Sequence, residues 1–385
     1  MKKSTTPLAG TRALSRRSFL GMVGMAGFAC AAGLGLAGCD DGSSAAAAVD
    51  YNSMSLEDLI AQAQEEGEIA SVGMPDTWAN WVETWTDIES EYGITHADQD
   101  MSSSEELAMF REEGTDGTKD IGDVGYSFTT TALEEDCLQP YTVSSWDSIP
   151  DWAKDPDGFW ACSYTGNTCL IYNTALTNGQ APTTWKELME SDIVVNMGNV
   201  VGGASSQANI IACAIANGGG FDNVQPGIDY FKELAKQGRL DPSDGNKSLL
   251  KAGEVQCLGG RFDFNGATWS QEINAENIDG VHVVAVIPQD GAVMTGYAQI
   301  INKWAPHPYA AALTMEYLFS EQGMIDRAYG GARPTRTDIT LPDDVPLLPD
   351  EQYQNVTTAE SLEQLQTACD EVSRLWQEEV IPLMG

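Results

Sequence analysis

Hydrophobic positions along residues 54 to 379 recur with two periods, one typical of helices and one typical of strands. The first helix is predicted to begin at Ser55, which forms a capping box with Asp58, and to end at Gly67, before a strand over 69–73. The alternation that follows predicts an α/β architecture with largely parallel sheets. Helices are predicted over 77–91, 105–113, 183–189, 205–217, 226–237, 308–320 and 358–379, and strands over 121–125, 170–172, 281–287 and 298–301.

The first 38 residues carry a sorting pattern. Arg16 and Arg17 precede an uncharged run over 19–38 and resemble a twin-arginine export signal, and the sequence Leu-Ala-Gly-Cys that ends at Cys39 resembles a lipobox. The run is long enough for a transmembrane anchor, but its Gly and Ala content makes it only weakly hydrophobic. We therefore expect 1–38 to be a twin-arginine lipoprotein signal peptide, cut before Cys39, and 39–50 to be a lipidated flexible tether.

The chain is strongly acidic, with 57 Asp and Glu against 20 Lys and Arg and a formal net charge of −37. The predicted signal holds five basic residues and no acidic one, so its removal takes the net charge from −37 to −42. Such a surface repels nucleic acid and anionic lipid headgroups. We therefore expect no nucleic-acid partner, and a membrane link through the lipid on Cys39 alone.

Six cysteines remain after the predicted signal and the lipidated position, an even number that permits up to three disulfides outside the cytoplasm. Cys162 and Cys169 are the candidate pair, because they flank 164–167, which could form the bend of a hairpin. The alternative is that the cysteines are small buried apolar side chains. None has the spacing of zinc ligands.

Six motifs lie in order along the mature chain: 59–68 (LIAQAQEEGE), 164–173 (YTGNTCLIYN), 182–188 (PTTWKEL), 305–312 (APHPYAAA), 319–323 (FSEQG) and 333–335 (RPT). Their order and spacing resemble the extracellular solute-binding proteins of ABC importers, which have the type II periplasmic-binding-protein fold. The branch that the chain resembles covers binders of polyamines, thiamine, ferric ion and phosphonates.

The resemblance implies two α/β lobes joined by crossing strands, each lobe built from separate stretches of the chain. A ligand would lie between the lobes, and closure about a hinge would present the closed form to a permease. It also implies a monomer without a cofactor, whose partners are a small-molecule ligand and the permease subunits of an ABC transporter. The predicted crossings lie near 160–172 and 281–297; lobe 1 comprises 51–160 plus 281–337, and lobe 2 comprises 161–280 plus 338–385.

Ligands of α/β proteins bind at the carboxyl ends of strands, so the loops after the predicted strands hold the candidate residues of the first lobe. Trp81 and Trp85 share a helical face with Trp78 and are interpreted as core, whereas Trp78 stands near the helix start. The candidates for ligand binding are Asp76, Trp78 and Asn80 after the first strand, and Asp123, Tyr126 and Ser127 around the end of the strand over 121–125.

The second lobe and the crossing segments supply further candidates. Backbone N–H groups ahead of the helix over 205–217 could hold an anionic group, and an ordinary loop with a serine cap is the alternative. Strand alternation would place three of the candidates, at 261, 263 and 265, on one face. The candidates are Asn167, Ser205, Ser206, Arg261, Asp263, Asn265 and Tyr297, with core packing as the alternative for Tyr297.

The charge of the ligand has two readings, and the sequence slightly favours the first, a cation, over the second, an anion. The three candidate aspartates, with Trp78 and Tyr126, favour an organic cation such as a polyamine or a thiamine-like molecule, through carboxylate pairing and cation–π contact. The two candidate serines with Arg261 suit a phosphonate or carboxylate. Iron-binding relatives use an adjacent pair of tyrosines, and no two tyrosines here are adjacent, so ferric ion is disfavoured.

An exported hydrolase and a surface adhesion lipoprotein are the competing classes. The histidines, His96, His282 and His307, have no metal-binding spacing, and no Gly-x-Ser-x-Gly motif occurs. Ser248 and Lys251 match the short Ser-x-x-Lys pattern of penicillin-interacting enzymes, but its companion motifs are missing. An adhesion role would explain the anchor and the charge but not the motifs. We therefore expect no enzyme activity, no catalytic residue and no bound metal.

Overall fold

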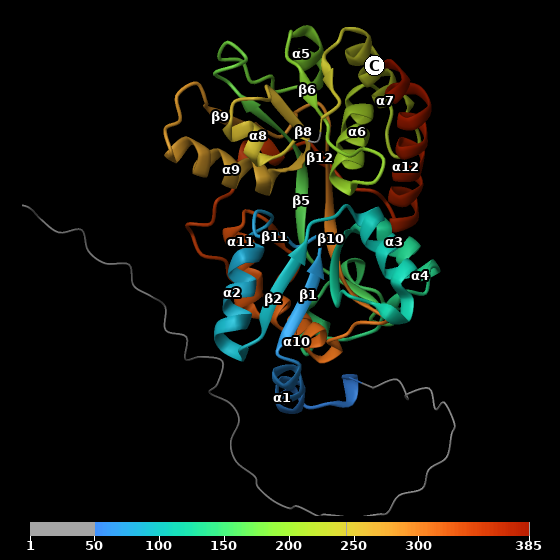
Figure 1. Ribbon diagram of the computed structural model, residues 1–385. Coiled ribbons are helices and arrows are strands. Elements are labelled where there is room, and N and C mark those ends of the chain that lie inside the picture. The colour runs from blue at the N-terminus through green and yellow to red at the C-terminus, as the bar shows by residue number, and fades with distance from the viewer. Residues whose placement is uncertain (1–50, 244, 385) are drawn as a thin grey trace, which may run out of the picture. The chain divides into compact units, whose positions relative to one another are not determined.

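The computed structural model describes residues 51–243 and 245–384 as a mixed α/β fold (Figure 1). The predicted signal peptide and tether, including Cys39, lie outside the described residues. Helices and strands alternate along the described chain, which confirms the α/β class predicted from the hydrophobic pattern. Within the described ranges, no helix has both the length and the apolar character needed to cross a membrane.

Most helices of the described chain follow the predicted pattern, and local caps explain their ends, but the helices over 129–134, 247–251, 263–275 and 321–329 were not predicted. Ser55 accepts a hydrogen bond from the Asp58 N–H at 3.1 Å, and Gly67 ends α1 with a φ of 71°. The helices are α1 (Leu56–Glu66), α2 (Trp81–Tyr92), α3 (Ser103–Glu113), α4 (Thr129–Glu134), α5 (Trp185–Glu190), α6 (Ala204–Ala216), α7 (Gln225–Lys236), α8 (Lys247–Lys251), α9 (Asp263–Ala275), α10 (Pro308–Leu318), α11 (Glu321–Tyr329) and α12 (Leu362–Leu375).

The second helix begins four residues later than the predicted position, 77. Ala79 and Asn80 have φ values of 43° and 58°, in the left-handed region, so the helix begins only at Trp81. Trp78 therefore lies in a loop, while Trp81 and Trp85 are buried and stack on each other with ring centroids 5.9 Å apart. The interpretation of Trp81 and Trp85 as core is confirmed.

The first sheet is built around parallel strands whose carboxyl ends lie at the same edge. The antiparallel strand β10 extends it and places Gln299 opposite Asp123. The sheet comprises, in order, β2 (Thr95–Gln99), β1 (Glu68–Val72), β3 (Ile121–Gly125) and β10 (Ala292–Asn302), with β4 (Leu138–Gln139) paired to β10 and β11 (Arg333–Pro334) paired to β5.

One long strand, β5, is shared by both sheets, and a second, β10, runs antiparallel beside its first half. The strand β5 (Trp160–Asn173) pairs with β10 along its first half and with strands of the second sheet along its second half. The return strand β10 overlaps the segment predicted for it, 281–297, from Ala292 to Tyr297 and continues to Asn302. Because a crossing strand and a returning strand run in opposite directions, the pairing at this junction is antiparallel, and the prediction of largely parallel sheets is wrong there.

The second sheet includes a strand from the range predicted as lobe 1, 281–337, because Val283–Val286 pairs with the second half of β5. The lobe boundaries stay predictions. The sheet comprises β7 (Leu240–Asp241), β6 (Val195–Asn196), β8 (Cys257–Phe262), the second half of β5 and β9 (Val283–Val286), and β12 (Val356–Thr357) pairs with the start of β10.

The predicted bend over 164–167 does not form, because β5 is extended and buried for 14 residues. Cys162 and Cys169 are seven residues apart on it, or about 23 Å at the usual rise of a strand. A disulfide requires Cα atoms closer than about 7 Å. The six cysteines of the described chain are free and buried, so the prediction of a Cys162–Cys169 bridge is wrong and the cysteines pack as small apolar side chains.

A further correction concerns the end of β8. The strand stops at Phe262, and Asp263 begins α9, whose first turn is closed by a hydrogen bond from the Phe262 N–H to Oδ1 of Asn265 at 3.3 Å. Arg261 therefore lies on a strand while Asp263 and Asn265 lie on a helix. The prediction that the three side chains share one face of a strand is wrong.

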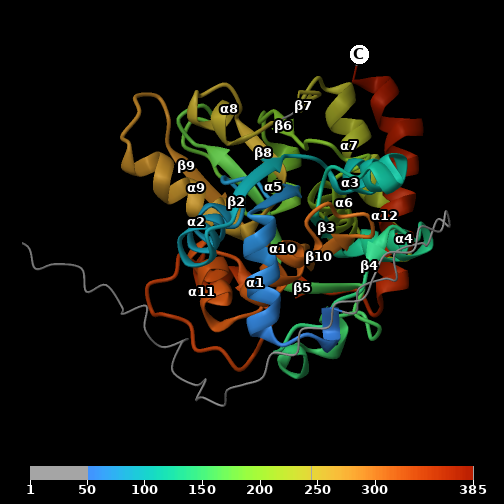
Figure 2. The ribbon, with the colours of Figure 1, turned by 60° about the horizontal axis from the view of Figure 1, so that its bottom comes forward.

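Packing around α6 places its first turn at the junction of the two sheets. This helix is buried from Ala204 to Ala214 and packs against β8, β10, α7 and α12 (Figure 1). Beside the first sheet, helix α1 packs along helix α10 (Figure 2). The elements β3, β5, α6, β8 and β10, which carry six of the thirteen predicted ligand-binding residues, therefore form the centre of the fold.

Candidate functional site

Trp78 is half-buried in the loop between β1 and α2. Its indole Nε1 donates a hydrogen bond to Oη of Tyr164 on β5 at 3.0 Å. Its ring meets the ring of Phe264, in the first turn of α9, edge-on at 5.1 Å between centroids, and the ring of Tyr297 on β10 at 5.6 Å. A side chain from the first sheet's loops thus contacts both crossing strands and a helix of the second sheet.

The other two candidates of this loop lie differently. Asp76 is exposed. Asn80 donates from Nδ2 to the Asp326 carbonyl at 3.0 Å, and its own carbonyl accepts a hydrogen bond from Arg327 at 2.8 Å. These contacts hold the left-handed turn against α11, so Asn80 stabilises the loop. The structure does not bring Asn80 together with the aromatic rings that contact Trp78.

Asp123 is buried on β3 with both carboxylate oxygens occupied. Oδ2 accepts a hydrogen bond from Tyr164 Oη at 2.6 Å, and Oδ1 accepts one from Gln299 Nε2 at 2.6 Å. Burial raises the pKa of Asp123 to about 7, although both hydrogen bonds favour the ionised form. Its contacts lie within the fold, so it supplies no carboxylate to a solute in this arrangement.

Tyr126 and Ser127 lie away from Trp78's contacts. Tyr126 Oη donates to the carbonyl of Trp152 at 2.7 Å, and its ring packs edge-on against Trp152 and Trp160. Burial raises the pKa of Tyr126 to about 12. Ser127 is buried and hydrogen-bonds the thiol of Cys369 on α12. These two residues join β3 to its neighbours, and the structure does not bring them together with the other candidates.

The first turn of α6 contacts Tyr297 through Ser205. The positive charge of Arg261 also acts on Tyr297. The Ser205 side chain hydrogen-bonds the Tyr297 hydroxyl; burial raises the pKa of Tyr297, and the positive charge of Arg261 opposes that rise. Arg261 donates to the backbone carbonyls of Gly260, at 2.8 Å, and Gly245. The first N–H groups of a helix have no acceptor within it, and α6 has no side-chain cap. These groups together form a donor-rich region whose chemistry suits an anion, with Ser205 and Tyr297 buried.

Asp263 fastens α9 to β5. Its Oδ1 accepts from the Asn167 backbone N–H at 2.8 Å and its Oδ2 accepts from Asn167 Nδ2 at 2.9 Å, in a buried pair. Burial raises the pKa of Asp263, and the hydrogen bonds from Asn167 oppose the rise. Asp263 and Asn167 therefore hold the start of α9 against β5.

Two further candidates are engaged with the backbone. Ser206 is buried and donates from Oγ to the carbonyl of Met197 at 2.7 Å. Asn265 is buried and closes the first turn of α9. Neither faces the ring contacts of Trp78.

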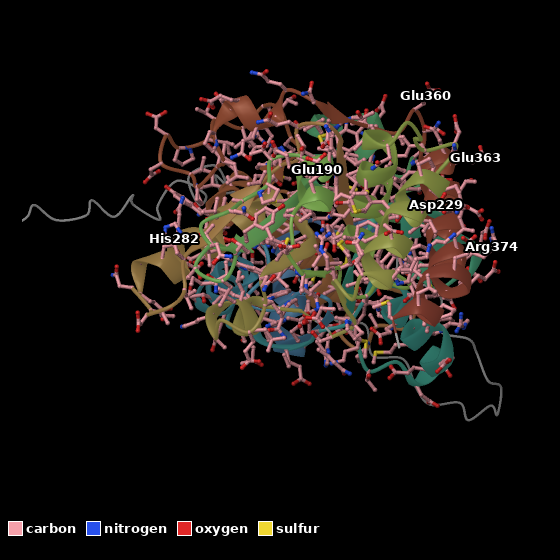
Figure 3. The ribbon with its side chains drawn as sticks, turned by 90° about the horizontal axis from the view of Figure 1, so that it is seen from above. Glu190, Asp229, His282, Glu360, Glu363 and Arg374 are labelled. Carbon is pink, nitrogen blue, oxygen red and sulfur yellow. The ribbon has the colours of Figure 1, made fainter. Side chains whose placement is uncertain are left out.

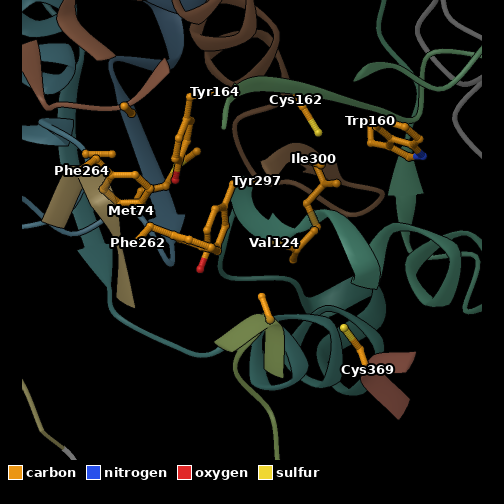
Figure 4. Close-up of a cluster of buried hydrophobic side chains, with 14 of the residues drawn as sticks. Met74, Val124, Trp160, Cys162, Tyr164, Phe262, Phe264, Tyr297, Ile300 and Cys369 are labelled. Carbon is orange, nitrogen blue, oxygen red and sulfur yellow. The ribbon is translucent and has the colours of Figure 1, made fainter. Parts of the chain in front are cut away.

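An aromatic cluster fills the junction of the two sheets (Figure 4). The rings of Tyr164 and Tyr297 lie nearly parallel, with centroids 5.6 Å apart and 11° between their planes, and Phe262 and Phe264 stand beside them. Sequence reasoning did not single out Tyr164, Phe264 or Gln299. Two features of the sequence could have identified them. Tyr164 belongs to the motif over 164–173, and Gln299 is an amide inside an apolar strand.

Glycines allow the first sheet to touch α6 directly. A Cβ on Gly125, at the end of β3, would collide with the Cβ of Ala204, the first residue of α6. A Cβ on Gly202 would collide with Oγ of Ser104 on α3. The two halves of the fold therefore approach each other to backbone distance at these points.

A separate groove of about 690 Å³ lies between the segment before α7 and α12 and contains none of the predicted site residues. Acidic side chains, among them Glu360 and Glu363, lie on this side of the fold (Figure 3). They do not form a metal site: in the described part of the chain, no group of three or more His, Cys, Asp or Glu could hold a metal ion.

The family can now be stated. Residues 116–365 match the model of the bacterial extracellular solute-binding proteins, and because this covers more than half of the chain, the protein belongs to that family. Members bind small solutes for ABC transport, so the family consists of binding proteins rather than enzymes. A search of curated proteins found no match.

Solved structures with the same fold are two-lobe periplasmic binding proteins, which confirms the predicted fold class. AfuA from Actinobacillus pleuropneumoniae, with fructose-6-phosphate bound, is 16% identical over 81% of this chain and 98% of its own, with a TM-score of 0.63. Iron-bound HitA from Pseudomonas aeruginosa is 13% identical, over 81% and 98%, with a TM-score of 0.62. PotD from Streptococcus pneumoniae, the spermidine/putrescine ABC transporter protein solved with calcium and HEPES, is 15% identical over 82% and 99%, with a TM-score of 0.58.

Proposed function

We propose that this protein is exported by the twin-arginine route and anchored by a lipid on Cys39 at the outer face of the cytoplasmic membrane, facing the periplasm or the cell exterior. There it captures a small anionic solute between its two lobes, as a monomer, and delivers it to the permease of an ABC importer. The family supports the transport role. The export signal and the lipobox pattern support the location.

The crossing strands supply the hinge of this mechanism. Among the strands described, β5 pairs in both sheets and β10 runs antiparallel beside it, and the contacts of Trp78 and of α6 are made at their junction. A solute that contacts both halves stabilises the closed arrangement over the open one by its differential affinity. The permease then recognises the closed arrangement.

The burial and hydrogen bonding of the candidate carboxylates favour an anionic solute over a cationic one. Asp123 and Asp263 are buried and hydrogen-bonded within the fold, which leaves Asp76 as the exposed carboxylate of the cation hypothesis. The donors around Ser205, Tyr297 and Arg261 are the observation that carries the proposal, because hydroxyls, a guanidinium and helix N–H groups all favour negative charge. A phosphonate, a phosphate ester or a carboxylate fits this chemistry. AfuA, of the same fold, was solved with a sugar phosphate.

A thermal-shift screen tests the solute class. The panel comprises phosphonates, sugar phosphates, carboxylates, polyamines, thiamine and ferric salts. A solute at 100 times its dissociation constant adds about 2.7 kcal/mol of stability. For a protein of this size the melting temperature should rise by roughly 2–4 °C per kcal/mol. A response to anions alone supports the proposal. A response to polyamines or thiamine alone restores the cation hypothesis, and no response from any class would favour a surface adhesion role.

Charge-removing variants sharpen the screen. Arg261→Gln should weaken an anionic solute by at least tenfold, which corresponds to about 1.4 kcal/mol. The matched control is Arg374→Gln, which removes an exposed guanidinium paired with Glu371 and Glu378 on α12. Asp76→Asn should leave anion binding unchanged or improve it. Loss of binding in Asp76→Asn together with unchanged binding in Arg261→Gln would reject the anion site.

A further inference from the structure

A chain of hydrogen bonds leads from the buried Asp123 to Trp78. The Trp78 indole N–H can only donate, so the oxygen of Tyr164, 3.0 Å away, must accept. The single hydroxyl proton of Tyr164 is then directed at Oδ2 of Asp123, at 2.6 Å. Each bond therefore fixes the direction of the next, and the chain ends on an acceptor.

Gln299 fixes the other oxygen of the same carboxylate. Its Oε1 accepts from the backbone N–H of Ser163 on β5 at 2.8 Å, so its Nε2 must be the atom that faces Asp123. Nε2 donates to Oδ1 at 2.6 Å. Both oxygens of Asp123 thus receive donors, which is the pattern of an ionised carboxylate.

At its other end the chain reaches the contact between the two halves of the fold. The Trp78 ring lies edge-on to Phe264, which opens α9 of the second sheet, and to Tyr297. Trp78 comes from a loop, so its side chain is positioned by its packing against these two rings and by the hydrogen bond from its indole N–H to the Tyr164 hydroxyl.

We propose that Asp123 is a positioning residue that acts through Tyr164 to hold the Trp78 indole at its contact with Phe264, where the solute is captured. Asp123 and Tyr164 do not touch the solute in this role. The inference rests on the proposed function in one respect, namely that Trp78 faces the solute.

The proposal predicts a dependence on pH near neutrality. Burial raises the pKa of Asp123 to about 7. Above that pH the carboxylate is ionised and accepts the hydrogen bond from the Tyr164 hydroxyl, and the chain is complete. Below it, a proton on the carboxyl removes the charged acceptor of Tyr164 and loosens Trp78. The charged and titratable groups that act on Asp123 are Asp98 on β2, Glu106 on α3, Cys162 on β5, Tyr164 on β5, Tyr297 on β10 and Arg327 on α11.

Fluorine NMR of the protein labelled with 5-fluorotryptophan tests the positioning without any solute. Trp78→Phe assigns the Trp78 signal by its disappearance. We expect that signal to shift with a midpoint near pH 7 in the unmodified protein. The shift should be lost in Asp123→Asn and in Tyr164→Phe, which removes only a hydroxyl. The matched control is Tyr172→Phe, the same change at another buried tyrosine of β5, which should keep the shift.

Two outcomes would overturn the proposal. One is a Trp78 signal that does not move in a titration centred on pH 7, and the other is an equal movement in Tyr164→Phe. Affinity for a solute found in the thermal screen supplies the second measurement, and it should fall below the midpoint in the unmodified protein only. If the Trp78 signal shifts as expected but Trp78→Ala binds that solute unchanged, the hydrogen-bond chain stands and the proposed solute site fails.

Discussion

At the scale of single residues, the most unusual group is the buried carboxyl of Glu106. It lies on α3 under the ends of β1 and β3, and its Oε2 accepts from the Asp123 N–H at 3.1 Å. Gly73 and Gly122 make room for it, because a Cβ on either would collide with its carboxyl oxygens. Burial raises the pKa of Glu106 well above its usual value, and the nearby negative charge of Asp123 adds to the rise.

This pKa has a definite consequence for stability. Because the folded protein keeps a proton that the unfolded chain has lost, stability falls as pH rises above the ordinary glutamate pKa, by up to about 1.4 kcal/mol per pH unit, until the folded-state pKa is passed. In Glu106→Gln this contribution should vanish, and the slope of unfolding free energy against pH should become flatter. Urea titrations at several pH values measure it. An equal slope in Glu106→Gln, or the same flattening in the exposed control Glu57→Gln, would contradict the assignment.

Arg327 is a second buried charge. Its guanidinium stacks on the Trp81 ring at 3.8 Å and donates to the Asn80 carbonyl at 2.8 Å and to Oγ1 of Thr84. Burial lowers the pKa of Arg327 to about 10. A planar guanidinium can stack and donate to both partners, whereas an ammonium cannot.

We therefore expect Arg327→Lys to destabilise the protein by about 2–4 kcal/mol, from the lost stacking and the lost hydrogen bonds. The control is Arg111→Lys, whose exposed ion pair with Glu135 should change stability by less than about 1 kcal/mol. Chemical denaturation of both variants measures the difference. Equal effects would show that the stacking on Trp81 contributes nothing.

At the scale of elements, the contact of β3 with α6 joins the two halves of the fold. Gly125→Ala should push Ala204 away and destabilise the protein by about 1–3 kcal/mol, as overpacking does. Since this contact lies across the junction, the same variant should also weaken solute binding. Gly220→Ala is the matched control, because a Cβ there meets nothing within 4 Å. Thermal melts and solute titrations test both variants, and identical behaviour would reject the contact.

The extended strand β5 makes a prediction about the thiols. Under the proposed export in folded form, the protein folds in the reducing cytoplasm, and the six cysteines of the described residues are buried and free. Unfolded protein of residues 50–385, prepared without reductant, should therefore react with a thiol reagent at six positions. Four reactive thiols would indicate one disulfide and would restore a bridge such as the one first expected between Cys162 and Cys169.

At the scale of the whole molecule, the acidic surface and the predicted anchor belong together. A mature chain with a net charge near −42 gains nothing from anionic headgroups, so the lipid must hold it at the membrane. In cells that make the full-length chain, Cys39→Ser should move the protein from the membrane fraction to the soluble fraction. Replacing Arg16 and Arg17 together by Lys should keep it inside the cell. Membrane retention of Cys39→Ser would refute lipid anchoring at that residue.

The sequence by itself determined the α/β class, the positions of helices such as α1 and α10, and the family. These features depend on local periods, caps and motif order, which are read along the chain. It also identified Trp78, Tyr297, Ser205 and Arg261 as candidates, but not what surrounds them.

Only the tertiary structure decided which polar groups face inward. Asp123 meets Tyr164, 41 residues away, and Gln299, 176 residues away, and Asp263 meets Asn167, 96 residues away. No local pattern encodes such pairings, because they depend on how two crossing strands bring distant segments together. The same crossing kept β5 straight, which separated Cys162 from Cys169 and joined Trp78 to Phe264.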